Sequence, residues 1–382
     1  MSEYTPPLRV TSPAALDTLA RCRDLVLPAL RETIDRLHPW LGRMASFTFD
    51  WCDSDGTPTV RGTGNNSGGG NSGGGNGNGG GGGGGGGKAL RPALAVLAAE
   101  AVGAPAQAAV AGAVAVELVH AFSLVHDDIM DGDERRRHRA TAWKAFGVGP
   151  AVLAGDALLA LALDTLAHST GRLAPATRSA AMSLLSTSLV ELVNGQAADI
   201  AFEYRPWTGP DAVTVEEYRT MATRKTGSLL GCASALGALL GGAPPEMVTA
   251  MSLVGRDLGT AFQAVDDLLG IWGDPAVTGK PVFNDLRLRK KTLPVICALA
   301  GSTASAQQLA DLLAMPLDTP DAEWTLRRTA ALISKAGGRS FTTAQAHLHL
   351  DRALRTLDSA AMERTAAAEL ITLSEFVVNR TH

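Results

Sequence analysis

The sequence predicts an all-α protein built as a single large helical bundle, and two features of its composition favour that class. Ala and Leu, which lose little conformational freedom in a helix, dominate a chain that is 46% hydrophobic and only 5% aromatic. Val, Ile and Thr do not gather into several short alternating runs, which argues against a sheet. We therefore expect one core of packed helices.

Helices are expected in eight segments, with three or four more up to about residue 378, and Pro and Gly mark most of their ends. The eight segments are 13–38, 89–102, 105–131, 143–168, 175–202, 214–241, 245–272 and 291–300. The longest uncharged stretch, 226–245, is long enough to suggest a membrane span. Its many Gly and Ser residues fit better a central helix that neighbouring helices approach closely.

A run of Gly, Asn and Ser between residues 62 and 87 interrupts this pattern and contains 18 of the 42 glycines. The run has nothing apolar to bury and cannot offset its ordering entropy, so we expect a flexible loop. The chain then divides into an N-terminal helical segment of the bundle (1–61), the flexible loop (62–87) and the main bundle (88–382).

The charge balance excludes several classes of partner. Thirty-four Lys and Arg against 38 Asp and Glu give a net charge of −4, so no net basic field draws the chain to nucleic acid or anionic lipid. The four cysteines lie far apart without metal-ligand spacing. The N-terminus has no apolar signal segment, so we expect a cytoplasmic protein.

A first acidic cluster closes the predicted helix 105–131. Asp127 and Asp131 are four residues apart and share a helix face, with Asp128 beside them. Negative charge is unfavourable at a helix C-terminus, so a cation should compensate, and oxygen ligands without Cys suit Mg²⁺. Arginines suited to phosphate follow at Arg135, Arg136, Arg137 and Arg139. A solvated acidic helix end, or salt bridges between these charges, is the alternative.

A second acidic cluster closes the predicted helix 245–272. Gln263, Asp266 and Asp267 lie on one helical side, because residues three and four apart are neighbours. Cations surround the following Asp285, namely Lys280, Arg287, Arg289, Lys290 and Lys291. Two apolar helices that face each other and end in acids can build a metal site inside a bundle. The two clusters together predict a site for a metal–diphosphate complex.

At these residues the sequence resembles the trans-isoprenyl diphosphate synthases, or polyprenyl synthetases, from Lys88 to the C-terminus. Asp127-Asp128-Ile-Met-Asp131 is similar to the family's first aspartate-rich motif, and Asp266-Asp267 is similar to the start of the second. Gly87-Lys88-Ala-Leu-Arg91-Pro92 resembles the family's G-K-x-x-R-P element. His120, Lys225-Thr226 and Lys280 stand at the spacings that the family uses for diphosphate contacts.

The resemblance implies a bundle of the isoprenoid synthase type around a central apolar cavity. It implies an enzyme that joins isopentenyl diphosphate to an allylic diphosphate, with three Mg²⁺ ions, or Mn²⁺ as a substitute, held by Asp127, Asp131 and Asp266. The implied catalytic residues are Asp127, Asp128, Asp131, Asp266, Asp267 and Lys225. The implied substrate-binding residues are Lys88, Arg91, His120, Arg136, Arg137, Lys225, Thr226, Gln263, Lys280 and Lys290. It also implies a homodimer, and we expect neither a nucleic-acid partner nor a membrane span.

The sequence departs from the family's pattern at several places. The second motif normally ends in a third Asp, where this chain has Gly270. The family usually has Gly-Ser before Asp285, where this chain has Phe283-Asn284, and Gly after Arg136-Arg137, where it has His138. These departures leave the second metal site less secure than the first.

Product length in the family depends on residues below the first motif. Phe122 and Ser123 stand five and four residues before Asp127. In the family, aromatic residues at both places stop growth at fifteen carbons, whereas one aromatic with a small neighbour admits twenty. We therefore expect geranylgeranyl diphosphate as the product, with farnesyl diphosphate as the alternative.

Two other classes of function are weighed against this one. A terpene cyclase would need a different second metal motif, which 194–199 does not fit, and has no need of Lys88, Arg91 and His120. A non-catalytic subunit that regulates a prenyl synthase would treat the departures as marks of decay. Individually, His120, Gln263 and Lys225 could be packing or solvated residues, and His126, His347 and His349 are interpreted as structural or surface residues.

Overall fold

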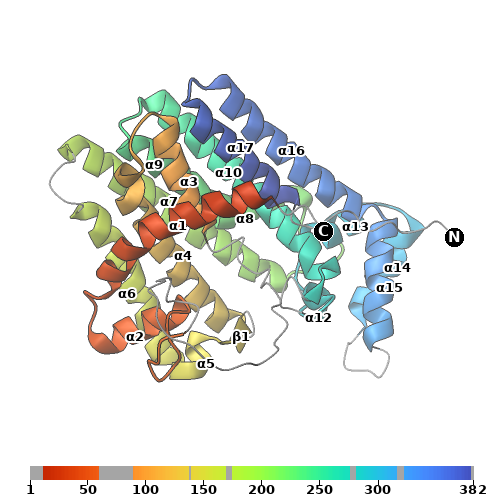
Figure 1. The fold of residues 1–382 in the computed structure, drawn as a ribbon. Helices are drawn as coiled ribbons and strands as arrows, with labels where there is room; N and C mark the ends of the chain where they lie inside the picture. The colour runs from red at the N-terminus through yellow and green to blue at the C-terminus, as the bar shows by residue number, and fades with distance from the viewer. Residues whose placement is uncertain are drawn as a thin grey trace, which may run out of the picture.

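A computed structural model describes residues 12–59, 89–136, 139–168, 174–275, 281–315 and 322–379. The expected flexible loop 62–87 lies outside these residues. The described chain is an assembly of helices that pack side by side (Figure 1). Its strands, β1 (Arg135–Arg136) and β2 (Arg139–Ala140), form a short antiparallel pair with Arg136 opposite Arg139. The predicted all-α class is confirmed.

The helices follow the predicted order. Those of the first half are α1 (Pro13–Ile34), α2 (Pro39–Thr48), α3 (Leu90–Ala101), the 3₁₀ turn η2 (Ala106–Ala109), α4 (Val110–Met130), α5 (Ala142–Phe146), α6 (Val148–Ala167) and α7 (Pro175–Glu203). Those of the second half are α8 (Val215–Ala222), the π turn η3 (Thr223–Gly227), α9 (Ser228–Leu240), α10 (Pro245–Trp272), α12 (Asn284–Arg287), α13 (Leu293–Ala300), α14 (Ala304–Ala314), α15 (Ala322–Lys335), α16 (Gly338–Ser359) and α17 (Arg364–Asn379).

Local sequence explains most helix ends and also the two places where the predicted segments were wrong. The segment 13–38 ends at Ile34, and Pro39 begins a separate helix, as its fixed φ allows at a first helical position. The segment 143–168 is divided at Gly147, whose φ of 94° ends α5 before α6 begins. At the start of α8, Thr214 and Glu217 cap each other's backbone N–H groups.

The uncharged stretch 226–245 contains α9, the central helix of the bundle, as its small-residue content indicated. Every residue of α9 except Leu239 is buried. It contacts α3, α4, α7 and α10, and Figure 1 shows these helices around it. The helices α12 to α15 pack around a smaller apolar cluster that includes Ile271, Leu309 and Ile333.

Glycines on α9 and its neighbours allow this close packing. A Cβ atom at Gly237 would lie 2.0 Å from the carbonyl oxygen of Ala95 on α3. A Cβ atom at Gly255 on α10 would lie 2.3 Å from the carbonyl oxygen of Leu230 on α9. These backbones are too close for any larger residue, so the spacing of the core helices depends on glycine at both positions.

Two described segments, Ala106–Met130 and Val148–Ala167, are long and apolar enough to cross a membrane by length and composition alone. Core helices of soluble proteins pass the same test. The segment 106–130 is packed largely within the bundle, whereas Val148–Ala167 leaves more of its apolar residues exposed. That exposed face bears on subunit assembly, as argued below.

The substitution Gly237→Ala should destabilise the fold by about 1–3 kcal/mol, because the new methyl group must displace the α3 backbone. Chemical denaturation monitored by circular dichroism measures this change in the free energy of unfolding. Gly149→Ala on α6 is the matched control, since a Cβ atom there meets nothing within 4 Å. Equal stability of both variants would show that the α3–α9 contact does not limit the packing.

Candidate active site

The first acidic cluster lies at the C-terminal end of α4, as predicted. Asp128 is buried and accepts two hydrogen bonds from Arg136, from Nε at 2.9 Å and from a terminal nitrogen at 2.6 Å. Burial alone would lower the pKa of Arg136, but its bond to Asp128 raises that pKa above the ordinary value. Asp128 therefore anchors Arg136 beside the cluster, which leaves Asp127 and Asp131 as the carboxylates on the more open face.

Asp127 is the carboxylate whose ionisation the site perturbs most clearly. Burial raises its pKa from 3.8 to about 6, while the nearby Lys225 ammonium acts in the opposite direction. Asp131 and Asp199 add like charge and raise the pKa further. Its surroundings thus favour either a proton or another cation on this carboxylate at neutral pH.

Lys225 reaches the cluster from a distorted turn between α8 and α9. Its Nζ donates a hydrogen bond of 2.5 Å to Asp199 Oδ2 on α7. The turn, Thr223–Gly227, is a π helix, a distortion that often occurs at functional sites. Gly195 on α7 allows the approach, because a Cβ atom there would lie 2.3 Å from the backbone nitrogen of Lys225.

The second acidic cluster ends α10, and its Asp267 has a different environment from Asp127. Asp267 is 2% exposed and accepts hydrogen bonds from Tyr218 Oη at 2.5 Å, the Leu293 backbone N–H at 2.8 Å and Gln263 Nε2 at 3.0 Å. Burial raises its pKa to about 7, although these three bonds act to lower it. Asp267 therefore ties α8, α10 and α13 together, while Asp266 beside it is only partly buried.

A hydrogen-bond chain connects this anchor to the π turn. Thr226 Oγ1 donates to Gln263 Oε1 at 2.8 Å, and Gln263 in turn donates to Asp267. The bonds fix the direction of the Gln263 amide, with its carbonyl oxygen toward Thr226. The predicted side of α10 that carries Gln263 and Asp267 is thus confirmed, and Thr226 lies against it.

Gly270, where the family's pattern has a third Asp, makes room for another carboxylate. A Cβ atom at Gly270 would lie 1.9 Å from Asp285 Oδ2. The loop after α10 folds back to bring Asp285 there, because the Phe283 N–H donates to the carbonyl oxygen of Ile271 at 3.2 Å. The space beside the second cluster is therefore occupied by a carboxylate that comes from the loop.

Phe283, the second departure, adopts a conformation that favours glycine. Its φ of 63° lies in the left-handed region, where a non-glycine residue costs about 1 kcal/mol or more. Its side chain packs against the apolar cluster of α12 to α15. The family's Gly is thus replaced by a residue that accepts backbone strain and gains apolar contact.

Lys290 joins the two clusters. Its Nζ donates a hydrogen bond of 2.8 Å to Asp131 Oδ2 at the end of α4. Burial would lower the pKa of Lys290, but Asp131, with Asp199 and Asp285, raises it above the ordinary value. The loop after α10 therefore reaches across to α4, and both acidic helix ends border one charged site.

The other predicted cations have other partners. Arg139 binds Asp50 and Asp53 beyond α2, at 2.7 and 3.0 Å, and so holds the N-terminal segment. Arg287 pairs with Glu323 at 2.6 Å, Arg289 donates to backbone carbonyls at the end of α14, and Lys291 lies 3.9 Å from the centre of the Trp207 ring. The expectation that all of these cations surround Asp285 was wrong, since their partners lie elsewhere.

The remaining candidate residues divide into those the structure places and those it does not describe. Arg91 is buried in the first turn of α3, and His120 is half-buried on α4 two turns before Asp127. Lys88, Arg137, His138 and Lys280 lie outside the described residues. Asp199 and Tyr218 were missed by the sequence reasoning, because neither belongs to a recognisable acidic run. His349 is buried and pairs with Asp257 at 2.7 Å, as a structural residue would.

Phe122 and Ser123 lie on α4 below the first cluster. Phe122 is 9% exposed, and Ser123 Oγ donates to the carbonyl oxygen of His120 at 2.9 Å. That bond holds the small side chain of Ser123 against its own helix, so Phe122 is the bulky group at this level.

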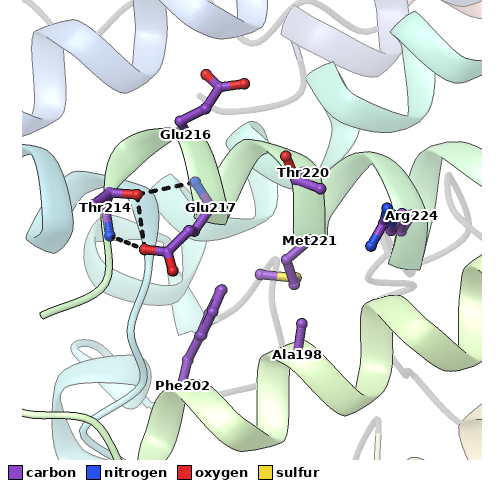
Figure 2. Close-up of a pocket in the computed structure, with 8 residues that line it drawn as sticks. All are labelled: Ala198, Phe202, Thr214, Glu216, Glu217, Thr220, Met221 and Arg224. Atoms are coloured by element: carbon purple, nitrogen blue, oxygen red, sulfur yellow. Dashed lines mark hydrogen bonds between the residues drawn. The ribbon is translucent and has the colours of Figure 1, made fainter. Parts of the chain in front are cut away.

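A surface pocket of about 470 Å³ lies between α7 and α8, apart from the two clusters. Figure 2 shows its apolar floor, with Phe202 and Ala198 from α7 opposite Met221 from α8. Thr214 and Glu217 at its edge bond to each other as the helix cap described above. None of the candidate site residues lines this pocket, so it is not assigned to the site.

Among the described residues, no three carboxylate, imidazole or thiolate side chains already form a cluster that could hold a metal ion. Mg²⁺ is compatible with such a site, because it usually takes one or two carboxylates and completes its shell with water and substrate phosphates. The raised pKa of Asp127 also fits a place where a cation would relieve the cost of the buried charge.

This fold and charged site define a class, and comparison with known proteins agrees. The family model for polyprenyl synthetases matches residues 84–329. The chain therefore belongs to the polyprenyl synthetase family, whose members transfer prenyl groups.

Among its relatives, a protein of Mycobacterium tuberculosis named (2E,6E)-farnesyl diphosphate synthase is 41% identical over 96% of this chain and 93% of its own length. A geranylgeranyl diphosphate synthase of the same organism is 38% identical over 95% and 93%. The crystal structure of a polyprenyl synthetase from Streptomyces coelicolor superposes with a TM-score of 0.81 at 42% identity, over 95% of this chain and 99% of that one.

The substitution Asp127→Asn should stabilise the protein at pH 8 in the absence of divalent metal. Because the pKa of Asp127 is higher in the folded chain than its ordinary 3.8, ionisation opposes folding above about pH 6. We expect a gain of about 1–3 kcal/mol in the free energy of unfolding at pH 8, which shrinks as the pH falls through 6 toward 4.

Urea titrations at several pH values measure this gain. Glu216→Gln on the exposed surface of α8 is the control and should show no comparable effect. A loss of stability in Asp127→Asn at pH 8 would contradict the interpretation that this carboxylate is held at a cost.

Proposed function

We propose that the protein condenses isopentenyl diphosphate with an allylic diphosphate, head to tail and in the trans configuration, to make a short-chain prenyl diphosphate. The observation that carries this proposal is the meeting of carboxylates and cations around Asp127 and Asp131. Lys225 and Lys290 approach these two carboxylates from different elements. Such a mixture of acids and bases suits a diphosphate that arrives with divalent cations.

The reaction requires loss of diphosphate from the allylic substrate, which leaves an allylic cation. Lys225, held by Asp199, and Arg136, held by Asp128, would bind the leaving diphosphate and offset its growing charge. The Thr226 hydroxyl and the Gln263 amide, fixed by their bonds to Asp267, would direct their oxygens at the cation. The closely packed apolar walls of α4 and α9 would exclude water, which favours carbon–carbon bond formation over hydrolysis.

The second substrate, isopentenyl diphosphate, would bind at the N-terminal end of α3. Arg91 begins that helix and His120 lies on α4, and both match the family's motif for this role. We assign Lys88 and Arg137 to the same subsite from the sequence. The released diphosphate would take the final proton, so the protein needs no separate base.

Mg²⁺ is the cofactor that fits the site, with Asp127, Asp131 and Asp266 as its carboxylate ligands. When bound, it would supply positive charge that stabilises the departing diphosphate. We infer that Asp285, which lies beside Gly270, completes the negative charge at the second cluster in place of the family's third Asp.

For the product we propose geranylgeranyl diphosphate, because Phe122 has the small Ser123 as its neighbour on α4. Farnesyl diphosphate is the second candidate. The relative that is 41% identical and bears the farnesyl name supports it.

Mass analysis of the prenyl product tests this function. The full-length protein is incubated with Mg²⁺, isopentenyl diphosphate and, in separate reactions, dimethylallyl, geranyl or farnesyl diphosphate. We expect a C20 product in each reaction. Asp127→Ala should lower turnover by about a hundredfold or more, because it removes a group that carries charge in the transition state.

Asp351→Ala, at an exposed position on α16, is the matched control and should keep full turnover. Undiminished turnover in a folded Asp127→Ala variant would reject the metal assignment. A cyclised hydrocarbon would favour a terpene cyclase, and product formation only after another chain is added would favour a regulatory subunit.

We further propose that two copies of the chain associate through α6 and α7. These adjacent helices expose Val148, Val152 and Leu153 on α6, and Val190 and Val193 on α7. Val190 is 62% and Val193 52% exposed, a large apolar area for a folded surface. A closed dimer with two-fold symmetry would bury the same face of both copies.

The double substitution Val190→Glu/Val193→Glu should convert the dimer into a monomer, because it places charge in the buried interface. Light scattering after size-exclusion chromatography measures the mass. Leu16→Glu, which alters a similarly exposed apolar residue on α1, should leave the dimer intact. A dimer that survives the double substitution would place the interface elsewhere.

A further inference from the structure

His126, the residue before the first carboxylate, is seated against α6 rather than exposed. Its Nε2 lies 3.1 Å from the carbonyl oxygen of Val152 and 3.8 Å from Asp156 Oδ1. A Cβ atom at Gly155 would lie 2.3 Å from that same nitrogen. The imidazole ring therefore rests directly on the α6 backbone, in a position that only glycine at residue 155 permits.

The other side of the imidazole touches Phe122. The two rings lie one helical turn apart on α4, with centroids 4.8 Å apart and an interplanar angle of 68°. This edge-to-face arrangement is favourable for aromatic rings. The His126 ring thus occupies the space between Phe122 and α6, and Phe122 cannot turn into that space.

We propose that His126 is a positioning residue that holds the Phe122 ring in place and thereby helps to set the length of the prenyl product. The inference rests on the proposed function, in which Phe122 limits chain growth. Its physical basis is a fixed stack: the α6 backbone at Gly155, the imidazole of His126 and the phenyl ring of Phe122. Each member blocks movement of the next toward α6.

Removal of the imidazole should lengthen the product. In His126→Ala the Phe122 ring can rotate into the space above Gly155, which opens room for further isoprene units. An edge-to-face pair is worth about 0.5–1.5 kcal/mol, so we expect the ratio of products longer than the wild-type product to rise about two- to tenfold. Mass analysis of the products at equal substrate conversion measures that ratio.

Gly155→Ala tests the same stack from the α6 side. The new methyl group displaces the imidazole, so the product distribution should change in the wild-type background. It should have no further effect in His126→Ala, because its route to Phe122 passes through the imidazole. Gly149→Ala, also on α6 but with nothing within 4 Å of the new Cβ atom, is the matched control and should leave the products unchanged.

The outcomes separate this inference from the proposed function. If the wild-type protein forms no prenyl diphosphate, the proposed function fails. If it forms one, and folded His126→Ala gives the same distribution as the wild type, the positioning role is wrong. Additive effects of Gly155→Ala and His126→Ala would also overturn it. His126→Ala only removes atoms, so it keeps the test available if Gly155→Ala does not fold.

Discussion

The carboxylates that meet where α4, α7 and α10 border the site repel one another, and the site depends on the cations held between them. Lys225 bridges from the π turn to Asp199, Lys290 from the α12 loop to Asp131, and Arg136 from β1 to Asp128. Each cation comes from an element other than that of its acid. The ion pairs therefore stabilise the helix ends and also fix the relative positions of the elements that carry them.

Not every acid in this arrangement has the same task. Asp128 and Asp267 are buried and engaged by protein donors, so they serve as anchors for Arg136 and for the start of α13. Asp127 is buried enough to raise its pKa but keeps an open face. In each adjacent pair of aspartates, successive helical residues point in different directions, and one residue faces the protein while its neighbour faces the site.

The sequence was sufficient for the helices and for the two acidic ends, because both depend on local period and spacing. It predicted α9 as a buried central helix from its small residues alone. It could not reveal the π turn, since the extra residue in that turn follows from the close contact between Gly195 and Lys225, which are thirty positions apart. Asp199 was invisible for the same reason, because its role comes from the Lys225 ammonium that folding brings to it.

The cations show the limit of spacing as a guide. Arg287, Arg289, Lys290 and Lys291 follow one another closely, yet only Lys290 of these four reaches an acidic cluster in the described structure. Arg289 has a positive φ, so the backbone turns between these residues and sends their side chains in different directions. Charge density in a sequence therefore indicates a region, whereas the fold of the loop decides which residue acts.

The departures from the family's pattern are better explained as exchanges than as losses. Decay of a disused site would remove a carboxylate without a replacement nearby. Gly270 instead lies against Asp285, and the strained Phe283 backbone belongs to the loop that brings Asp285 there. A conformation that costs free energy persists when the surrounding structure holds it in place, and here its result is a carboxylate beside the second cluster. The geometry of this loop therefore favours an active synthase over a non-catalytic partner.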